Sequence, residues 1–158
     1  MNKDTIWIGN DHGGFEMKLQ VVEFLKKKGF DVNNIGTDST VAVRYPYFAA
    51  KIAGAISEGS ISRGILICST GIGMSIVANK YKGVRAALCT DSYMAKMTRA
   101  HNDSNILCLG GKITGTNLAI DIVNTWLYTP YEGGRHDISL GLIAEVEKVN
   151  CRKKRWIP

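Results

Sequence analysis

Five short segments of mostly apolar residues alternate with longer stretches of helical periodicity along this chain. The apolar segments are residues 5–9, 30–33, 64–69, 85–90 and 105–110. They are apolar or β-branched almost throughout, which is typical of parallel strands that are covered on both faces. Strands that alternate with helices pair in parallel through right-handed crossovers. The alternation predicts a single α/β domain, a doubly wound three-layer α/β/α sandwich around a five-stranded parallel sheet.

Four helices are expected from apolar periodicity and from the residues that begin and end helices. They cover about residues 15–28, 46–57, 117–128 and 137–149. Gly29 follows the first, where a helix commonly ends, and Pro46 fits the first turn of the second. The fourth is a trailing C-terminal helix with apolar residues three or four apart: Ile138, Leu142, Val146 and Val149. We expect residues 1–150 to form the domain and residues 151–158 to form a basic tail.

The charge of the chain is concentrated at its end. Of the formal net charge of +6, four positive charges come from Arg152, Lys153, Lys154 and Arg155. A solvated basic end is the plain interpretation, because no base-stacking aromatic motif accompanies it, so no nucleic-acid partner is expected. No apolar run approaches the ~20 residues that span a bilayer. With no signal-peptide pattern at the N-terminus, we expect a cytoplasmic protein without a membrane partner.

The four cysteines are Cys68, Cys89, Cys108 and Cys151, and none forms a Cys-x-x-Cys pair. Three of them lie in or at the ends of strand-like segments, which favours reduced thiols over a disulfide framework. No two Cys or His residues have the local spacing of zinc ligands, so we expect no metal.

In a doubly wound sheet, ligands bind beyond the carboxyl ends of the strands. Polar residues and glycines concentrate in the segments that follow the five expected strands. These segments are residues 10–14, 34–47, 69–73, 91–93 and 110–112. We therefore expect the site in these segments.

The segment after the third expected strand is the most informative of these. Residues 64–76 end a strand at Cys68, turn on Gly71 and Gly73, and start a helix. Glycines let backbone N–H groups face a bound oxyanion, and the helix start adds partial positive charge. Gly-x-Gly alone is a weak signal, and Ile76 stands where a dinucleotide fingerprint has its third glycine. A helix start also favours a reactive thiolate at Cys68, although a small buried hydrophobe is the alternative.

Two histidines are further candidates for acid–base chemistry, and each also has a plain structural explanation. Asp11 and His12 place an acid beside a switchable base, and an Asp that caps a helix is the plain alternative. His101 is expected near the end of the helix that precedes the fifth strand, where a histidine also stabilises the helix dipole.

Several segments together resemble the type B ribose-5-phosphate isomerases and their galactose-6-phosphate isomerase relatives. The resemblance runs in order through nearly the whole chain. The segments are Asp-His-Gly-Gly-Phe at residues 11–15, Arg-Tyr-Pro-Tyr-Phe-Ala at 44–49, the glycine turn and its flanks at 64–80, Gly-Val-Arg-Ala-Ala at 83–87, Thr-Arg-Ala-His-Asn-Asp-Ser-Asn at 98–105 and Tyr-Glu-Gly-Gly-Arg-His at 131–136.

The resemblance implies an aldose–ketose isomerase of sugar phosphates with Cys68 as the base that forms the enediolate. His101, aided by Asp11, would open the sugar ring. Arg135 would reach the phosphate from a neighbouring subunit, which implies a homodimer with Arg135 and His101 near the interface and leaves a tetramer open. The remaining implied roles are the anion-hole loop of Ser69, Thr70, Gly71, Ile72 and Gly73, substrate contacts from Asp11, His12, Asn102 and Lys112, and a pocket wall from Tyr45. No cofactor is implied.

Three residues depart from the family pattern. Arg44 stands where Asp is usual, Lys112 where Arg is usual, and Ser139 where a second phosphate-binding Arg is expected. Lys112 keeps the charge but loses the bidentate fork of arginine. These departures bear on the substrate, which is ribose 5-phosphate in the main interpretation and galactose 6-phosphate or allose 6-phosphate in the alternative. A non-catalytic module that binds sugar phosphates or nucleotides is the third option.

Overall fold

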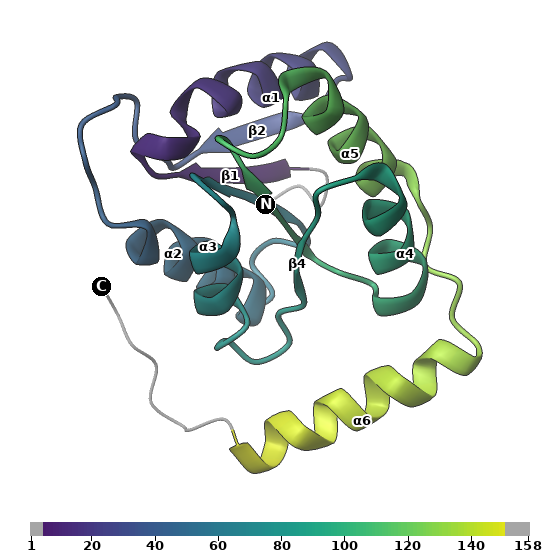
Figure 1. Ribbon diagram of the computed structural model, residues 1–158. Coiled ribbons are helices and arrows are strands. Elements are labelled where there is room, and N and C mark those ends of the chain that lie inside the picture. The colour runs from purple at the N-terminus through teal and green to yellow at the C-terminus, as the bar shows by residue number, and fades with distance from the viewer. Residues whose placement is uncertain (1–4, 151–158) are drawn as a thin grey trace.

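The computed structural model describes residues 5–150, and within them five parallel strands form one sheet (Figure 1). The elements in chain order are β1 (Thr5–Asn10), the 3-10 helix η1 (His12–Gly14), α1 (Phe15–Lys27), β2 (Asp31–Asn34), α2 (Tyr45–Ser57), β3 (Gly64–Cys68), α3 (Ile72–Ala78), β4 (Ala86–Leu88), α4 (Ser92–Asn102), β5 (Ile106–Gly110), α5 (Thr116–Tyr128) and α6 (Arg135–Asn150). The predicted α/β architecture, with its trailing helix, is confirmed. The expected tail at residues 151–158 lies outside the described residues.

Two apolar clusters hold helices on the two faces of the sheet. Helices α1, α4 and α5 cover one face, where Trp126 of α5 is fully buried against the strands. Helices α2 and α3 cover the other face, where Ile52 and Met74 are fully buried. The sheet is thus the middle layer of a three-layer sandwich.

The strand order is β2-β1-β3-β5-β4. The chain moves outward from β1 to β2 and then returns to place β3 on the other side of β1. The crevice at such a reversal is where doubly wound sheets bind ligands. The carboxyl ends of β1 and β3 therefore frame the expected site.

The two edge strands differ from the prediction. β3 and β5 are buried along their whole length, whereas Asp31 and Asn34 of β2 are exposed and β4 spans only three half-buried residues. An edge strand has one neighbour and less cover, so it needs fewer apolar residues. The expectation that all five strands are covered on both faces was wrong for these two.

The end of α1 follows its predicted signal. Gly29 adopts φ 83°, and the N–H groups of Gly29 and Phe30 donate to the carbonyls of Lys26 and Leu25 at 3.0 Å each. This paired pattern is the common glycine-dependent way to end a helix.

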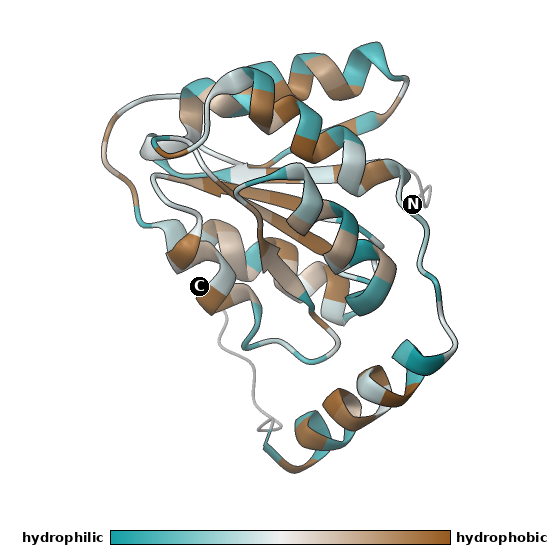
Figure 2. Ribbon diagram, turned by 45° about the vertical axis from the view of Figure 1, so that its right-hand side comes forward, coloured by the Kyte–Doolittle hydropathy of each residue, from teal (hydrophilic) through white to brown (hydrophobic). Residues whose placement is uncertain are grey.

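Helix α6 stands apart from the rest of the chain. No residue of α6 is buried, and its contacts are mainly with α4. Ile138, Leu142, Val146 and Val149, which we call the apolar stripe of α6, are 57–84% exposed. Figure 2 shows these apolar segments on a helix that projects from the sandwich. None of the helices in residues 5–150 is both long and apolar enough to cross a membrane.

Candidate active site

Cys68 is the last residue of β3 and is 5% exposed. The backbone N–H of Gly71 donates to its Sγ atom at 3.0 Å, and α3 begins at the next residue, Ile72. An N–H aimed at the sulfur and a helix start beside it both stabilise negative charge there. The geometry suits a thiolate.

The turn that carries this N–H depends on Gly71. Its φ is 77°, a left-handed conformation that L side chains rarely adopt. A Cβ atom at this position would lie 2.5 Å from Cδ1 of Leu88 and 3.0 Å from the backbone of Leu109. Both the backbone conformation and the close packing require glycine.

The other two described cysteines are poor bases. Burial, with a smaller contribution from Asp91, raises the pKa of Cys89 to about 12. Burial also raises the pKa of Cys108 well above its ordinary value. Both thiols are therefore protonated at neutral pH and cannot act as bases there.

The loops after β1 and β3 pack directly against each other. The N–H of Asp11 donates to the carbonyl of Ile67 at 3.2 Å. A Cβ atom on Gly13 would lie 2.1 Å from Oγ of Ser69, so the two loops touch at a glycine. The fold brings Asp11, His12 and the Cys68 loop to one place, as the strand reversal predicts.

Asp11 and His12 are both held by backbone N–H groups. Oδ1 of the buried Asp11 accepts from Gly13 at 2.9 Å, so this side chain caps η1. Nδ1 of His12 accepts from the N–H of Val43 at 3.3 Å. A neutral imidazole that accepts at Nδ1 carries its proton on Nε2, which can then donate to an anion.

Lys18, which the sequence pattern did not single out, holds the loop between β2 and α2 that contains Val43. The side chain of Lys18 is fully buried, donates to the carbonyl of Thr37 at 3.0 Å and pairs with Asp38. The hydrogen bond from Lys18, together with one from Asn34, lowers the pKa of Asp38. A buried lysine is rare without a partner, and this one ties residues 37–38 to α1.

The expected pocket wall and loop residues lie around the glycine turn. The Tyr45 ring packs so closely on Gly73 that a Cβ atom there would lie 2.7 Å from it. Oγ1 of Thr70 accepts from the N–H of Ile72 at 3.3 Å, which leaves the hydroxyl proton of Thr70 free to donate. The N–H of Lys112 donates to the carbonyl of Ser69 at 3.0 Å, and its side chain is exposed.

The structure does not bring His101 and Asn102 to the Cys68 loop within one chain. α4 runs antiparallel to the strands, so its last residues lie at the amino edge of the sheet. At that edge the N–H of Gly64 donates to the carbonyl of Asn105 at 2.9 Å. Gly64 is four residues before Cys68, a rise of about 13 Å along the strand. The expectation that Asp11 aids His101 is therefore not met inside a single chain.

His101 instead lies beside two residues that local sequence spacing could not connect to it. Its ring stacks on that of His136, with centroids 4.2 Å apart and planes 14° apart. Oε2 of Glu132 lies 3.8 Å from Nε2 of His101 and 3.6 Å from Nε2 of His136. Arg135 and Ser139, both exposed, begin α6 next to this cluster.

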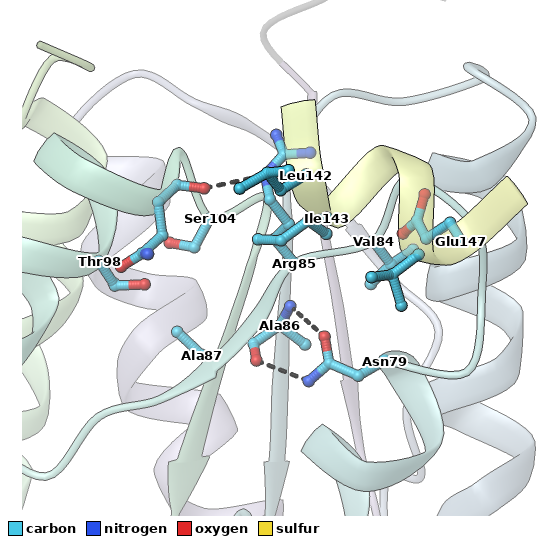
Figure 3. Close-up of a pocket in the computed structure, with 12 residues that line it drawn as sticks. Asn79, Val84, Arg85, Ala86, Ala87, Thr98, Ser104, Leu142, Ile143 and Glu147 are labelled. Carbon is cyan, nitrogen blue, oxygen red and sulfur yellow. Dashed lines mark hydrogen bonds between the residues drawn. The ribbon is translucent and has the colours of Figure 1, made fainter. Parts of the chain in front are cut away.

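A cavity of about 560 Å³ lies between α6 and the sandwich (Figure 3). It is lined by Leu142, Ile143 and Val146 of α6 and by residues around β4 and α4. At its floor Asn79 exchanges hydrogen bonds of 2.8 and 2.9 Å with Ala86. The cavity is at the amino side of the sheet, and Cys68 is not among the residues that line it.

The structure is a doubly wound α/β sheet that holds a thiol and a glycine-rich helix start where the strand order reverses. The chain belongs to the Ribose/Galactose Isomerase family, whose model matches residues 6–143. It is 43% identical to ribose-5-phosphate isomerase B of Escherichia coli over 143 residues, 90% of this chain and 96% of the relative.

A solved structure and a second curated relative are also similar to this chain. The structure of Clostridium thermocellum ribose-5-phosphate isomerase B matches with a TM-score of 0.89 and 52% identity, covering 92% of this chain and 98% of that one. The D-erythrulose-4-phosphate isomerase of Pectobacterium atrosepticum is 40% identical over 92% of each chain. The resemblance stated from the sequence motifs is confirmed.

Proposed function

We propose that this chain is an aldose–ketose isomerase that interconverts ribose 5-phosphate and ribulose 5-phosphate. The observation that carries the proposal is the Gly71 N–H on Cys68 Sγ at the strand reversal, in a chain of the Ribose/Galactose Isomerase family. Relatives of similar length carry the name ribose-5-phosphate isomerase B.

Proton transfer begins at the open-chain aldose. The Cys68 thiolate removes the proton from C2, the electron pair forms a C1–C2 double bond, and the C1 oxygen becomes negative in a cis-enediolate. The proton of the C2 hydroxyl then passes to the C1 oxygen, and the thiol returns its proton to C1. The product is the ketose, and no external oxidant or reductant takes part.

The glycine turn stabilises the charge that develops. The N–H of Gly71 donates to Sγ of Cys68, and the N–H of Ile72 donates to Oγ1 of Thr70. The other N–H groups of residues 69–73 and the free proton of the Thr70 hydroxyl can then hold the enediolate oxygens. Each such donor contributes about 3–4 kcal/mol to the transition state.

Ring opening requires His101, and we assign that step to His101 of a second copy of the chain. The support is the placement of His101, Asn102 and Arg135 at the amino edge of the sheet, beyond reach of Cys68 in their own chain. The apolar stripe of α6 offers a surface for such a homodimer. Leu142 and Val146 are 57% and 60% exposed in the single chain, and a second copy that packs on them would remove them from water. A closed two-fold dimer of this kind makes two equivalent sites.

The phosphate is anchored by the protonated Nε2 of His12, by Lys112 and by Arg135 of the second copy. Hexose phosphates such as galactose 6-phosphate or allose 6-phosphate are the alternative substrates, as is a four-carbon sugar phosphate, since one relative is named for D-erythrulose 4-phosphate. We place this activity in the cytoplasm, where the three described free thiols stay reduced.

The test is steady-state isomerisation of four-, five- and six-carbon sugar phosphates by the wild type, by Cys68→Ser and by the matched control Cys89→Ser. Cys68→Ser should lose at least about 100-fold in kcat, because a hydroxyl is a far weaker base. Cys89→Ser should keep kcat and change stability only. A nucleotide- or flavin-binding module would turn over none of these sugars, and Cys68 would be dispensable for its ligand.

A further inference from the structure

Three side chains with metal-binding atoms gather where α4 ends and α6 begins. They are His101, Glu132 and His136, and their ligand atoms all lie within 4.8 Å of one another. The residues come from two distant segments of the chain, which is why spacing along the sequence did not indicate a metal site.

The backbone holds these segments in place. The N–H of Glu132 donates to the carbonyl of Ala100 at 3.0 Å, which fastens the residue beside the end of α4. Gly133 and Gly134 both adopt positive φ, 64° and 60°, and turn the chain sharply into α6. This turn places His136 on the same side as Glu132, and the Tyr131 hydroxyl braces it by donating to Asp137 at 2.7 Å.

The distances from the Glu132 carboxylate to the two imidazole nitrogens fit ligands of a shared ion better than they fit direct hydrogen bonds. The Glu132 Oε2 atom is 3.8 and 3.6 Å from the two Nε2 atoms, beyond the usual ~3.2 Å limit of an N–H···O bond. A tetrahedral zinc site with ligand distances of about 2.1 Å has edges of about 3.4 Å. Small side-chain rotations therefore suffice to close the three donors on one ion.

The near-parallel rings are the feature that must change. The lone pair of each imidazole lies in the plane of its ring, and two near-parallel planes do not meet at one nearby point, so the rings have to tilt toward the ion. His101 and His136 side chains are 35% and 15% exposed, and His101 is the last residue but one of its helix. The tilt thus needs no rearrangement of the core.

We propose that His101, Glu132 and His136 form a site for a divalent transition metal of the zinc class, with a fourth position open to water. Two imidazoles and one carboxylate are a donor set that zinc takes. A bound ion occupies the nitrogen that ring opening needs, so the site is inhibitory. This consequence rests on the proposed function, whereas metal binding itself does not.

Metal binding is tested first, on the full chain without substrate, by titration with zinc and with cobalt(II). The variants are His136→Gln, Glu132→Gln and, as the control for thiol binding, Cys68→Ser. We expect one ion per chain, at least a tenfold loss of affinity in the first two variants, and wild-type affinity in Cys68→Ser. The cobalt spectrum should lack a thiolate charge-transfer band. Wild-type affinity in both His136→Gln and Glu132→Gln, or its loss in Cys68→Ser, would overturn the site.

Inhibition is tested second, with two substrates. Zinc should inhibit turnover of ribose 5-phosphate, which must open its ring, and should spare a four-carbon sugar phosphate that cannot close one. His136→Gln should relieve the inhibition in proportion to its lost affinity. Equal inhibition of both substrates would overturn the assignment to ring opening. A chain that binds the metal but isomerises no sugar would refute the proposed function and leave the metal site standing.

Discussion

Gly71 donates its backbone N–H to the sulfur of Cys68, three residues earlier, at 3.0 Å. This contact joins the end of the central strand to the start of α3. The contact depends on the positive φ of residue 71, which is 77°. It also depends on the absence of a side chain there, because Leu88 and Leu109 pack closely on this glycine.

Gly71→Ala should therefore damage catalysis beyond its effect on stability. A Cβ atom at positive φ costs about 1–2 kcal/mol, and the clash with Leu88 forces the turn to move its N–H away from sulfur. The matched control is Gly59→Ala, where φ is 74° and no atom lies within 4 Å of the added Cβ. We expect similar strain in both variants but a fall in kcat only for Gly71→Ala, measured by denaturant unfolding and steady-state kinetics. Equal kcat values would remove the N–H from the mechanism.

Lys18→Met should loosen the loop that holds His12. The variant removes the bonds from Lys18 to Thr37 and Asp38, while Asn10 still donates to the Thr37 carbonyl at 3.1 Å. The stability loss should stay near 1 kcal/mol, and KM for the sugar phosphate should rise severalfold with little change in kcat. Faster hydrogen exchange at Val43 is the structural readout. Unchanged exchange and KM would mean that Lys18 only fills the core.

The same pair gives a pH dependence with a defined sign. Lys18 lowers the pKa of Asp38, so the ionised carboxylate favours the folded state. This contribution is present above the unfolded pKa of about 3.9 and disappears as the pH falls through the lower folded value. The difference in unfolding free energy between wild type and Asp38→Asn should thus shrink as the pH drops below about 4. A difference that stays constant there would contradict the pairing.

The departures from the family pattern are tested by KM values for the wild type, Ser139→Arg and Arg44→Ala. A charge-assisted contact to phosphate contributes roughly 1.5–3 kcal/mol, which is about a tenfold change in KM or more. If Arg44 has replaced the missing arginine, Arg44→Ala raises KM and added Ser139→Arg restores it. If the place is vacant, Ser139→Arg alone lowers KM. Agreement of all three within a factor of two would show that neither position contacts phosphate.

The apolar stripe of α6 should control assembly and activity together. Leu142→Asp places a charge where we expect a second copy to pack, so the variant should sediment as a monomer and lose turnover of ribose 5-phosphate. Leu19→Asp is the control, because Leu19 is 48% exposed on α1, outside the proposed interface. A monomeric wild type would refute the dimer, as would a fully active monomeric variant.

Local patterns predicted much of the fold. The strand cores at β3 and β5, the end of α1 at Gly29 and the glycine turn after Cys68 all follow from short-range signals. Which side of α1 faces the sheet is known only from the structure, where Leu19 is 48% exposed whereas Val21 and Leu25 are fully buried. The opposite placement of Cys68 and His101 follows from the alternation itself, because Cys68 ends a strand whereas His101 ends the helix that precedes β5. The burial of Lys18 and the meeting of Glu132 with His101 could not be predicted, because they bring together segments that are distant in sequence.

The antiparallel course of α4 has a genetic consequence. If Cys68 and His101 of one site come from different chains, two defective chains can repair each other. Neither Cys68→Ser nor His101→Asn forms a working site alone, yet a mixed dimer holds one intact pair. An equal mixture of the two should recover about one quarter of wild-type activity on ribose 5-phosphate, because half of the dimers are mixed and half of their sites are whole. Alleles of this gene would then complement each other between copies, although each is null by itself.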